Sequence, residues 1–297
     1  MIQRIRRIIG SLKVRLIAKL YPKYLANKTY KSVFNKDINW EKPKNLIEKI
    51  YWLQLNTDTS LWTLCADKYR VREFVEERGC GEILNELFGK WDNADEIDFD
   101  KLPESFVLKT NNSCGQIIFV KDKSKLDYDE TRNQLDKWLK SKYGYDGAQL
   151  HYTKIKPCII AEKILENKSK GTSLIDYKIW CFDGEPECIL VAKERTWNKG
   201  SIDKYSLSMY DTNWNNISHI ALNESGTHYN GSDIEKPVSL EQMLKYAKIL
   251  SKGFKEVRVD FYEIDNKPVF GELTFTTGYG SYKYEFYEYL GSKFSLN

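Results

Sequence analysis

The fold is constrained most by a change of pattern at Pro103, because apolar residues recur at helical spacing before it and short β-rich runs dominate after it. Helical patterns also cover 126–144 and 239–254, the latter with Ser239 and Gln242 at capping-box spacing. The β-rich runs cover 105–110, 116–122, 157–165, 174–194, 256–264 and 267–275. Strands interrupted by single helices predict an α+β layered fold rather than a barrel.

The N-terminal 36 residues carry ten Lys or Arg and no acid, which leaves 36 basic against 42 acidic residues in the rest of the chain. The basicity therefore belongs to this segment, and we expect no nucleic-acid partner. Apolar residues recur at helical spacing from Ile2 to Leu20 and stop at Pro22, which predicts a basic amphipathic helix. Two interpretations stay open: residues 1–22 lie on an anionic membrane surface, or they pack on the body or on a partner.

The six cysteines are scattered without metal-ligand spacing, which predicts reduced and mostly buried thiols. No apolar run approaches the roughly 20 residues of a membrane-spanning helix, and no secretory leader is recognisable. We therefore expect a cytoplasmic protein, peripheral at the inner face of the membrane if the N-terminal helix binds there.

Two acids lie in strands that should be buried, Asp260 in "VRVDFY" and Glu272 in "VFGELTF". Strand alternation puts Arg258, Asp260 and Tyr262 on one face, and it puts Glu272 and Thr274 on a face with Phe270. A turn at Asp265-Asn266 would bring the two acids together, where a magnesium ion would relieve their repulsion. The alternative is that Asp260 forms a structural ion pair with Arg258 or a lysine at a sheet edge.

Further candidate residues lie upstream of this pair. Lys109 ends a strand and is followed by the small polar loop "NNSCG", a combination typical of phosphate binding. Glu162 and Lys163 follow an apolar strand, in a place suited to an adenine edge. Asp176 and Lys178 share a strand face, where the acid suits ribose hydroxyls and the lysine suits a phosphate. Each of these charges could instead be a solvated strand residue.

The order of these features resembles the ATP-grasp superfamily, and most closely its TupA-like branch from bacterial cell-surface polysaccharide biosynthesis. The resemblance covers roughly residues 40–290 and lies in "ADKYRVREFV", "LPESFVLKTNNSCG", "DYKIWCFDGEP", "VRVDFY" and "GELTFTTGYG". It implies two α+β subdomains that grip ATP, preceded by a helical region. The divisions expected are a basic helix and linker at 1–36, a helical region at 37–103, and an ATP-grasp domain at 104–297 whose lid spans about 104–160.

Site residues carried over from the resemblance fall into three groups. Lys109 would contact the α- and β-phosphates, the covering loop would include Asn112, Ser113 and Gly115, and adenine and ribose would be bound by Glu162, Lys163 and Asp176. The magnesium ligands would be Asp260, Glu272 and Thr274, the last replacing the Asn that the superfamily commonly has. Catalytic contacts to phosphate would come from Arg258, Lys178 and Arg195.

The resemblance further implies an ATP-dependent ligase with ATP and Mg2+ as cofactors. Such an enzyme activates a carboxylate, here a sugar uronate or glycan-linked acid, as an acylphosphate and joins it to an amine or amino acid. Its expected place is the synthesis of capsule or other cell-envelope polysaccharide. Two alternatives remain, a glycan phosphotransferase on the same fold and a non-catalytic glycan-binding or scaffold protein.

Overall fold

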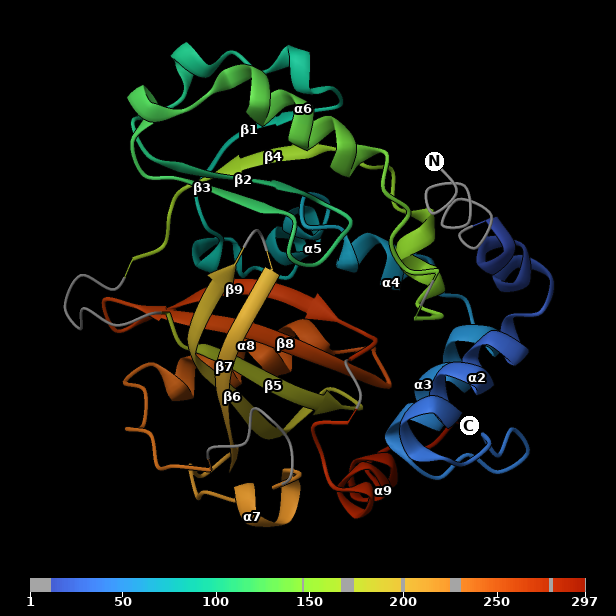
Figure 1. Ribbon diagram of the computed structural model, residues 1–297. Coiled ribbons are helices and arrows are strands. Elements are labelled where there is room, and N and C mark those ends of the chain that lie inside the picture. Colours follow the sequence, from blue (N-terminus) through green and yellow to red (C-terminus); the bar gives the residue numbers. More distant parts are fainter. Residues whose placement is uncertain are drawn as a thin grey trace.

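A computed structural model of the chain describes residues 12–145, 147–166, 174–198, 201–224, 231–277 and 280–296, without the side chains of 195–198 and 201–204. Two antiparallel sheets lie one above the other, as predicted for an α+β fold (Figure 1). After a first helix over residues 12–20, the described α-helices are α2 (Pro22–Phe34), α3 (Leu46–Asn56), α4 (Ser60–Ala66), α5 (Val71–Glu77), α6 (Tyr128–Leu139), α7 (Ser218–Ala221), α8 (Leu240–Ser251) and α9 (Tyr284–Ser292).

The small sheet has the strand order β1-β4-β2-β3. Its strands are β1 (Leu87–Trp91), β2 (Phe106–Thr110), β3 (Ile117–Val120) and β4 (Ile159–Glu162). Phe106 and Leu108 point to α6 and share a core with Leu135 of that helix. Because successive strand residues alternate, Lys109 lies on the other face, which is turned toward the large sheet (Figure 1).

The large sheet has the order β7-β6-β5-β8-β9. Its strands are β5 (Asp176–Phe182), β6 (Glu185–Asn198), β7 (Ser201–Asp211), β8 (Glu256–Ile264) and β9 (Lys267–Thr274). Two-residue turns join β5 to β6 and β8 to β9, with positive φ at Asp183 and Gly184 and at Asp265 and Asn266. The turn predicted at Asp265-Asn266 is therefore confirmed, and the turn residues of both hairpins suit the left-handed conformation that such turns need.

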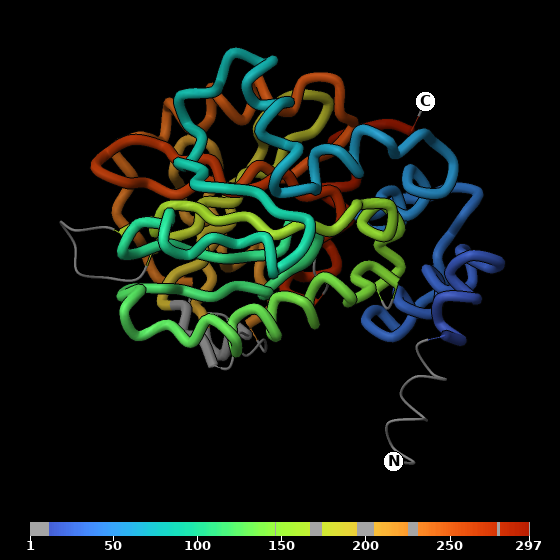
Figure 2. The backbone as a smooth tube through the Cα atoms, turned by 90° about the horizontal axis from the view of Figure 1, so that it is seen from above, coloured from blue at the N-terminus to red at the C-terminus, as the bar shows by residue number. Residues whose placement is uncertain are grey.

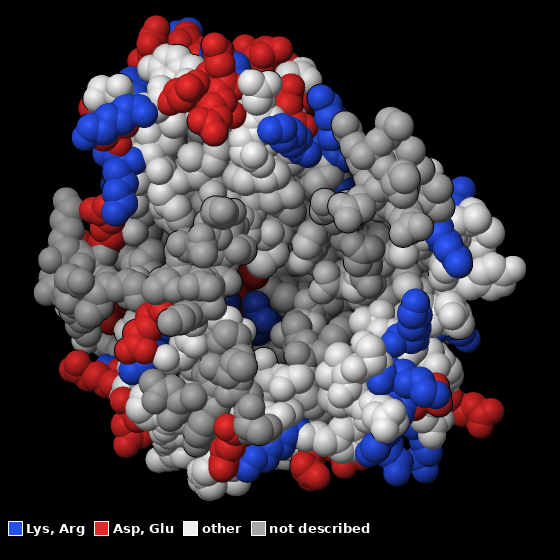
Figure 3. All heavy atoms as spheres, in the orientation of Figure 1, with Lys and Arg blue, Asp and Glu red and all other residues white. Residues whose placement is uncertain are grey.

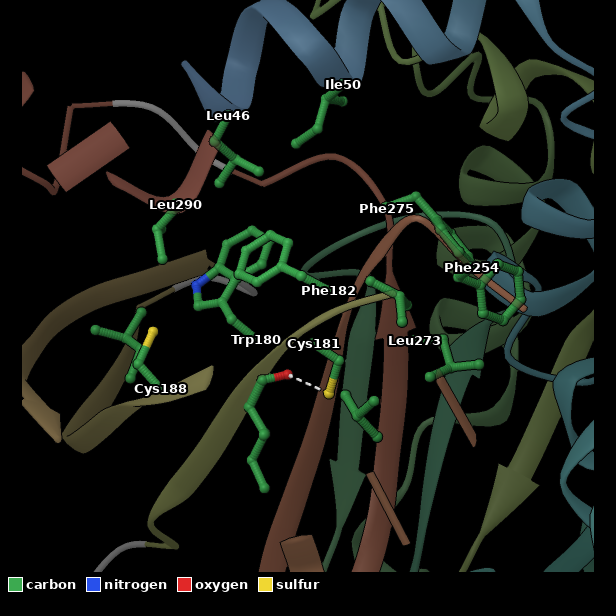
Figure 4. Packing of buried hydrophobic residues seen from close by; sticks show 14 of the residues in the cluster. Leu46, Ile50, Trp180, Cys181, Phe182, Cys188, Phe254, Leu273, Phe275 and Leu290 are labelled. Carbon is green, nitrogen blue, oxygen red and sulfur yellow. Dashed lines mark hydrogen bonds between the residues drawn. The ribbon is translucent and has the colours of Figure 1, made fainter. Parts of the chain in front are cut away.

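The two faces of the large sheet differ in what covers them. Alternate residues such as Val257 and Val259 pack with α8, and the Cys181 thiol lies 3.9 Å from the Ala247 carbonyl of that helix. On the opposite face, Trp180 and Phe182 lie beneath α3 and α9, close to Ile50 and Leu290 (Figure 4). The rest of that face, toward Lys178 and Asp176, is turned to the small sheet.

The N-terminal segment is helical over residues 12–20, and Pro22 begins α2 as its first residue. The predicted end of the first helix at Tyr21-Pro22 is thus confirmed, while residues 1–11 lie outside the described residues. Figure 2 shows this end of the chain beside the sheets rather than over them. Five cysteines are buried and free as predicted, and Cys114 is exposed.

Two expectations about local structure are wrong. The region 37–103 was expected to be helical, but it contributes β1, which pairs with β4 and belongs to the small sheet. The small sheet therefore begins before the lid range 104–160, although the domain boundaries themselves stay a prediction. Ser239 makes no capping box, because its hydroxyl donates to Glu263 on β8 at 2.8 Å.

Candidate nucleotide-binding site

A cluster of charged side chains lies on β5, β8 and β9, on the face turned to the small sheet. Arg258 donates to Asp260 through Nε and Nη2, both at 2.7 Å. Lys178 Nζ lies 2.5 Å from Asp260 Oδ2 and 2.8 Å from Asp176 Oδ2. Asp260 is only 1% exposed, so its carboxylate is held by two cations inside the protein.

Glu272 lies directly opposite Asp260 in the strand register, as the turn at Asp265-Asn266 predicted. Its side chain is 38% exposed, and it receives a hydrogen bond from Thr274 Oγ1 at 3.0 Å. Arg258 Nη2 lies 3.6 Å and Lys68 Nζ lies 3.5 Å from its oxygens. Glu272 is therefore the acid of this cluster that remains accessible.

The charges in the cluster balance, with Asp176, Asp260 and Glu272 against Lys68, Lys178 and Arg258. Burial raises the pKa of Glu272, but Lys68, Lys178 and Arg258 outweigh it and lower that pKa to about 2. Burial likewise opposes the charged form of Lys178, yet Asp176 and Asp260 raise its pKa above the ordinary value. Glu272 and Lys178 are thus expected to stay ionised at neutral pH.

A bulge at Gly271 corrects the predicted faces of β9. The register pairs Asp260 with Glu272 but Phe261 with Phe270, so Gly271 is an extra residue between them. Paired residues share a face, so Phe270 lies on the opposite face from Glu272, contrary to the alternation we expected. A Cβ on Gly271 would lie 3.0 Å from the Asp260 carbonyl oxygen, which explains the glycine there.

Lys109 and Glu162 meet on the face of the small sheet turned to this cluster. Lys109 Nζ lies 2.6 Å from Glu162 Oε2, and Arg72 Nη1 lies 3.9 Å from Glu162 Oε1. Lys163 is separate from them, since its side chain is 61% exposed and its nearest acid is Glu86 at 3.5 Å. The structure thus brings two of the predicted nucleotide residues together and leaves Lys163 at the rim.

The covering loop between β2 and β3 is held by its own side chains. Ser113 Oγ lies 2.8 Å from Thr110 Oγ1 and donates to Gln116 Oε1 at 2.7 Å. Gly115 has a φ of 76°, a left-handed conformation that favours glycine. Asn112 is buried, and none of the described residues bonds to its Oδ1. This oxygen is therefore a buried acceptor without a partner among the described residues, next to Ser113 and Gly115 of the loop.

Lys68 is a site residue that sequence reasoning missed. Its backbone N–H donates to the Asn111 carbonyl at 3.0 Å, and its Nζ donates to the Ser113 carbonyl at 3.0 Å. Together with its approach to Glu272, these contacts link the covering loop to the charged cluster. The sequence sign of this turn was Asp67 directly before Lys68, because the Asp67 carboxylate accepts hydrogen bonds from the backbone N–H groups of Tyr69 and Arg70 and fixes the turn.

Apart from Lys163 at the rim and Arg195, the predicted residues lie in the cluster, the small sheet and the loop. The side chain of Arg195 lies outside the described residues, so its predicted phosphate contact stays a prediction. In Figure 3 the face of the molecule is hollowed between the two sheets, with basic and acidic atoms at the bottom. The charged cluster and Lys109 face each other across the space between the sheets.

The predicted magnesium ligands fit an ion unequally. The described residues contain no ready cluster of three metal-binding side chains. The side chain of Glu272 is only half-buried and has open lone pairs, which suits a hard cation. Asp260 already accepts three hydrogen bonds from Arg258 and Lys178, so it could join only if one of them moved aside. The ion-pair alternative for Asp260 thus describes the arrangement seen, although β8 is an interior strand and not an edge.

Comparison with known families identifies the class. A model of the TupA-like ATP-grasp family matches residues 48–295, and the chain therefore belongs to that family. The α+β fold described above is the ATP-grasp fold. None of the curated proteins matches the chain.

Several solved structures match the chain at low sequence identity. They include D-alanine–D-alanine ligase from Bacillus anthracis, at 17% identity and a TM-score of 0.43 over 72% of this chain and 58% of that one. N5-carboxyaminoimidazole ribonucleotide synthetase in its ADP complex matches at 14% identity and a TM-score of 0.44, over 77% of this chain and 50% of that one. Phosphoribosylamine–glycine ligase from Thermotoga maritima matches at 10% identity and a TM-score of 0.42, over 72% of this chain and 48% of that one. The chain spans only about half to three fifths of the length of these proteins.

Proposed function

We propose that the protein binds ATP with Mg2+ between the two sheets and is an ATP-dependent carboxylate–amine ligase. The substrate carboxylate would be a sugar uronate or a glycan-linked acid, and the second substrate would be an amine or amino acid. The place of the reaction would be bacterial cell-surface polysaccharide synthesis, which the membership of the TupA-like family supports. The observation that carries the proposal is Glu272, an accessible carboxylate kept charged by three cations beside the covering loop.

The chemistry proposed has two steps. The substrate carboxylate attacks the γ-phosphorus of ATP, giving an acylphosphate and ADP, and the amine then displaces phosphate to give an amide. Negative charge gathers on oxygen in both steps, so fixed positive charge lowers both barriers. No side chain has to act as a nucleophile.

The protein's own residues would bind and orient the phosphates. Lys109 of β2 and Lys68 of the turn before α5 would supply point charges beside the covering loop, and the loop amides would supply hydrogen bonds. Arg258 is fixed by Asp260, so it meets developing charge without having to reorganise. Glu272 would hold a magnesium ion, with Asp260 and Thr274 as further ligands, and the bound ion would neutralise phosphate charge.

The test is product analysis with the purified full-length chain. We would incubate it with Mg2+, ATP, a panel of uronic-acid oligosaccharides and a pool of amino acids, and follow ADP, free phosphate and amide by mass spectrometry. The proposal predicts repeated turnover to ADP, phosphate and amide only when both an acid and an amine are present. Phosphate retained on the sugar would instead indicate a phosphotransferase. A protein that neither binds ATP nor turns it over would be non-catalytic.

A further inference from the structure

The helix formed by residues 12–20 packs on the body along one side only. Ala18 is buried in the main core, and Ile17 packs against the same core. Away from this side, three leucines recur at intervals of four, and their exposed fractions are 56% for Leu12, 58% for Leu16 and 57% for Leu20. These three are called the leucine face below. The described part of the chain thus leaves a continuous apolar row uncovered.

Lysines border the leucine face on both sides. Successive helix residues are turned by about 100°, so Lys19 projects next to Leu12 and Lys13 projects next to Leu20. Both lysines are exposed. An apolar row between two basic edges is the arrangement of a helix that lies in the interface of a bilayer.

The surroundings of this helix are also basic. Residues 12–36 contain seven Lys or Arg and no acid. Arg15 lies over the Tyr145 ring at 5.9 Å, and Lys31 pairs with Asp37 at 2.8 Å. Lys13, Lys19 and Lys28 pair with none of the described carboxylates. Basic side chains gather over α2 and α3 at the lower right of Figure 3.

We propose that the leucine face binds an anionic lipid bilayer and holds the enzyme at a membrane surface. The charge of the segment favours this partner over a second copy of the chain. Two copies joined through their leucine faces would bring Lys13 and Lys19 of both together with no acid between them, and like charges at a contact are unfavourable. Among the described residues no helix is long and apolar enough to cross a bilayer, so the helix would lie on the surface.

Sedimentation with lipid vesicles tests the proposal on the full-length protein. We expect it to sediment with vesicles that contain phosphatidylserine and to stay in solution with pure phosphatidylcholine, with binding weakened by added salt. The triple change Leu12→Gln, Leu16→Gln and Leu20→Gln should lower the partition constant roughly a hundredfold or more. The double change Lys13→Gln and Lys19→Gln should lower it roughly fivefold for each lysine.

Matched changes elsewhere on the surface provide the control. Leu61, Ile220 and Val238 are exposed by 41%, 54% and 71%, and their combined change to Gln should leave vesicle binding unaltered. Circular dichroism and thermal melting would verify that each variant is folded. The proposal is overturned if the wild type ignores phosphatidylserine at low salt, if the control triple loses binding equally, or if light scattering shows that the leucine changes convert a dimer into a monomer.

Discussion

Lys68 and Glu272 approach each other from different parts of the fold, with Lys68 Nζ 3.5 Å from Glu272 Oε2. Lys68 is tied to the covering loop of the small sheet through Asn111 and Ser113, whereas Glu272 belongs to β9 of the large sheet. A nucleotide between the sheets would place its phosphates near both residues. This relationship makes the cluster a candidate binding site rather than a set of ion pairs within one sheet.

Changing Glu272 to Gln should remove activity without removing the fold. The side chain is 38% exposed, so we expect a loss of stability of only about 0–1 kcal/mol. Loss of the accessible carboxylate should lower the rate of ATP turnover by two orders of magnitude or more. Urea unfolding and ADP release would measure the two effects. Glu285→Gln on α9 is the control, and equal turnover in both variants would remove Glu272 from the site.

Changing Asp260 to Asn should destabilise the protein as well as inactivate it. Asp260 is buried between Arg258 and Lys178, and breaking a buried pair of this kind costs about 3–5 kcal/mol. Urea unfolding would measure this loss against Asp265→Asn in the exposed turn of the same hairpin. If Asp260→Asn unfolded at the same urea concentration as that control, the buried network would not stabilise the fold.

Changing Gly271 to Ala should disturb the pairing of the two acids. The added Cβ would press on the Asp260 carbonyl oxygen at 3.0 Å, so β8 or β9 must shift by a few tenths of an ångström. We expect about 1–2 kcal/mol of destabilisation and lower turnover. At Gly81 the nearest atom to an added Cβ is a flexible Glu76 carbon at 3.4 Å, so Gly81→Ala should be nearly neutral. Full activity of Gly271→Ala would show that the bulge is not needed.

His151 should make the protein less stable in mild acid. Burial and, to a smaller extent, the charge of Lys154 together lower the pKa of His151 from its ordinary value of 6.5 to about 3. The unfolded chain therefore binds a proton below pH 6.5 that the folded chain does not, so stability falls as pH drops from 6.5 toward 3. The slope is about 1.4 kcal/mol per pH unit.

The change His151→Phe tests this slope, since the neighbouring rings of Trp62 and Phe275 can accommodate an apolar residue. Urea unfolding at several pH values from 7 to 4 should give a flatter dependence for the variant. His219→Gln, at an exposed position, should keep the slope of the wild type. An unchanged slope in His151→Phe would mean that other groups cause the acid sensitivity.

Much of the large sheet could be predicted because its turns and alternation are local properties. Asp265 and Asn266 adopt positive φ readily, and this fixes which residues of β8 and β9 face each other. The opposition of Asp260 and Glu272 followed from that turn. The bulge at Gly271 could not be predicted, because counting alternate residues along a strand does not reveal an extra residue inserted into the pairing.

Features that depend on distant contacts were missed. β1 contains Gly89 and Lys90, which have low strand propensity, and it is stabilised by pairing with β4 about seventy residues later. Lys68 lies in a turn between helices, and its role depends on the covering loop and β9. The neutralisation of the acids by Lys178 and Arg258 was weighed only as an alternative, because burial and distance are not visible in a strand pattern.

Binding of ATP tests the central claim most directly. Isothermal titration calorimetry with Mg2+ and a non-hydrolysable ATP analogue should show one saturable site in the full-length protein. Lys68→Met should weaken that binding by one to two orders of magnitude, as expected when a hydrogen bond to a charged group is lost. The control Lys101→Met, at an exposed position between β1 and β2, should bind the analogue as the wild type does. Absence of saturable binding in the wild type, or undiminished affinity in Lys68→Met, would contradict a nucleotide site between the two sheets.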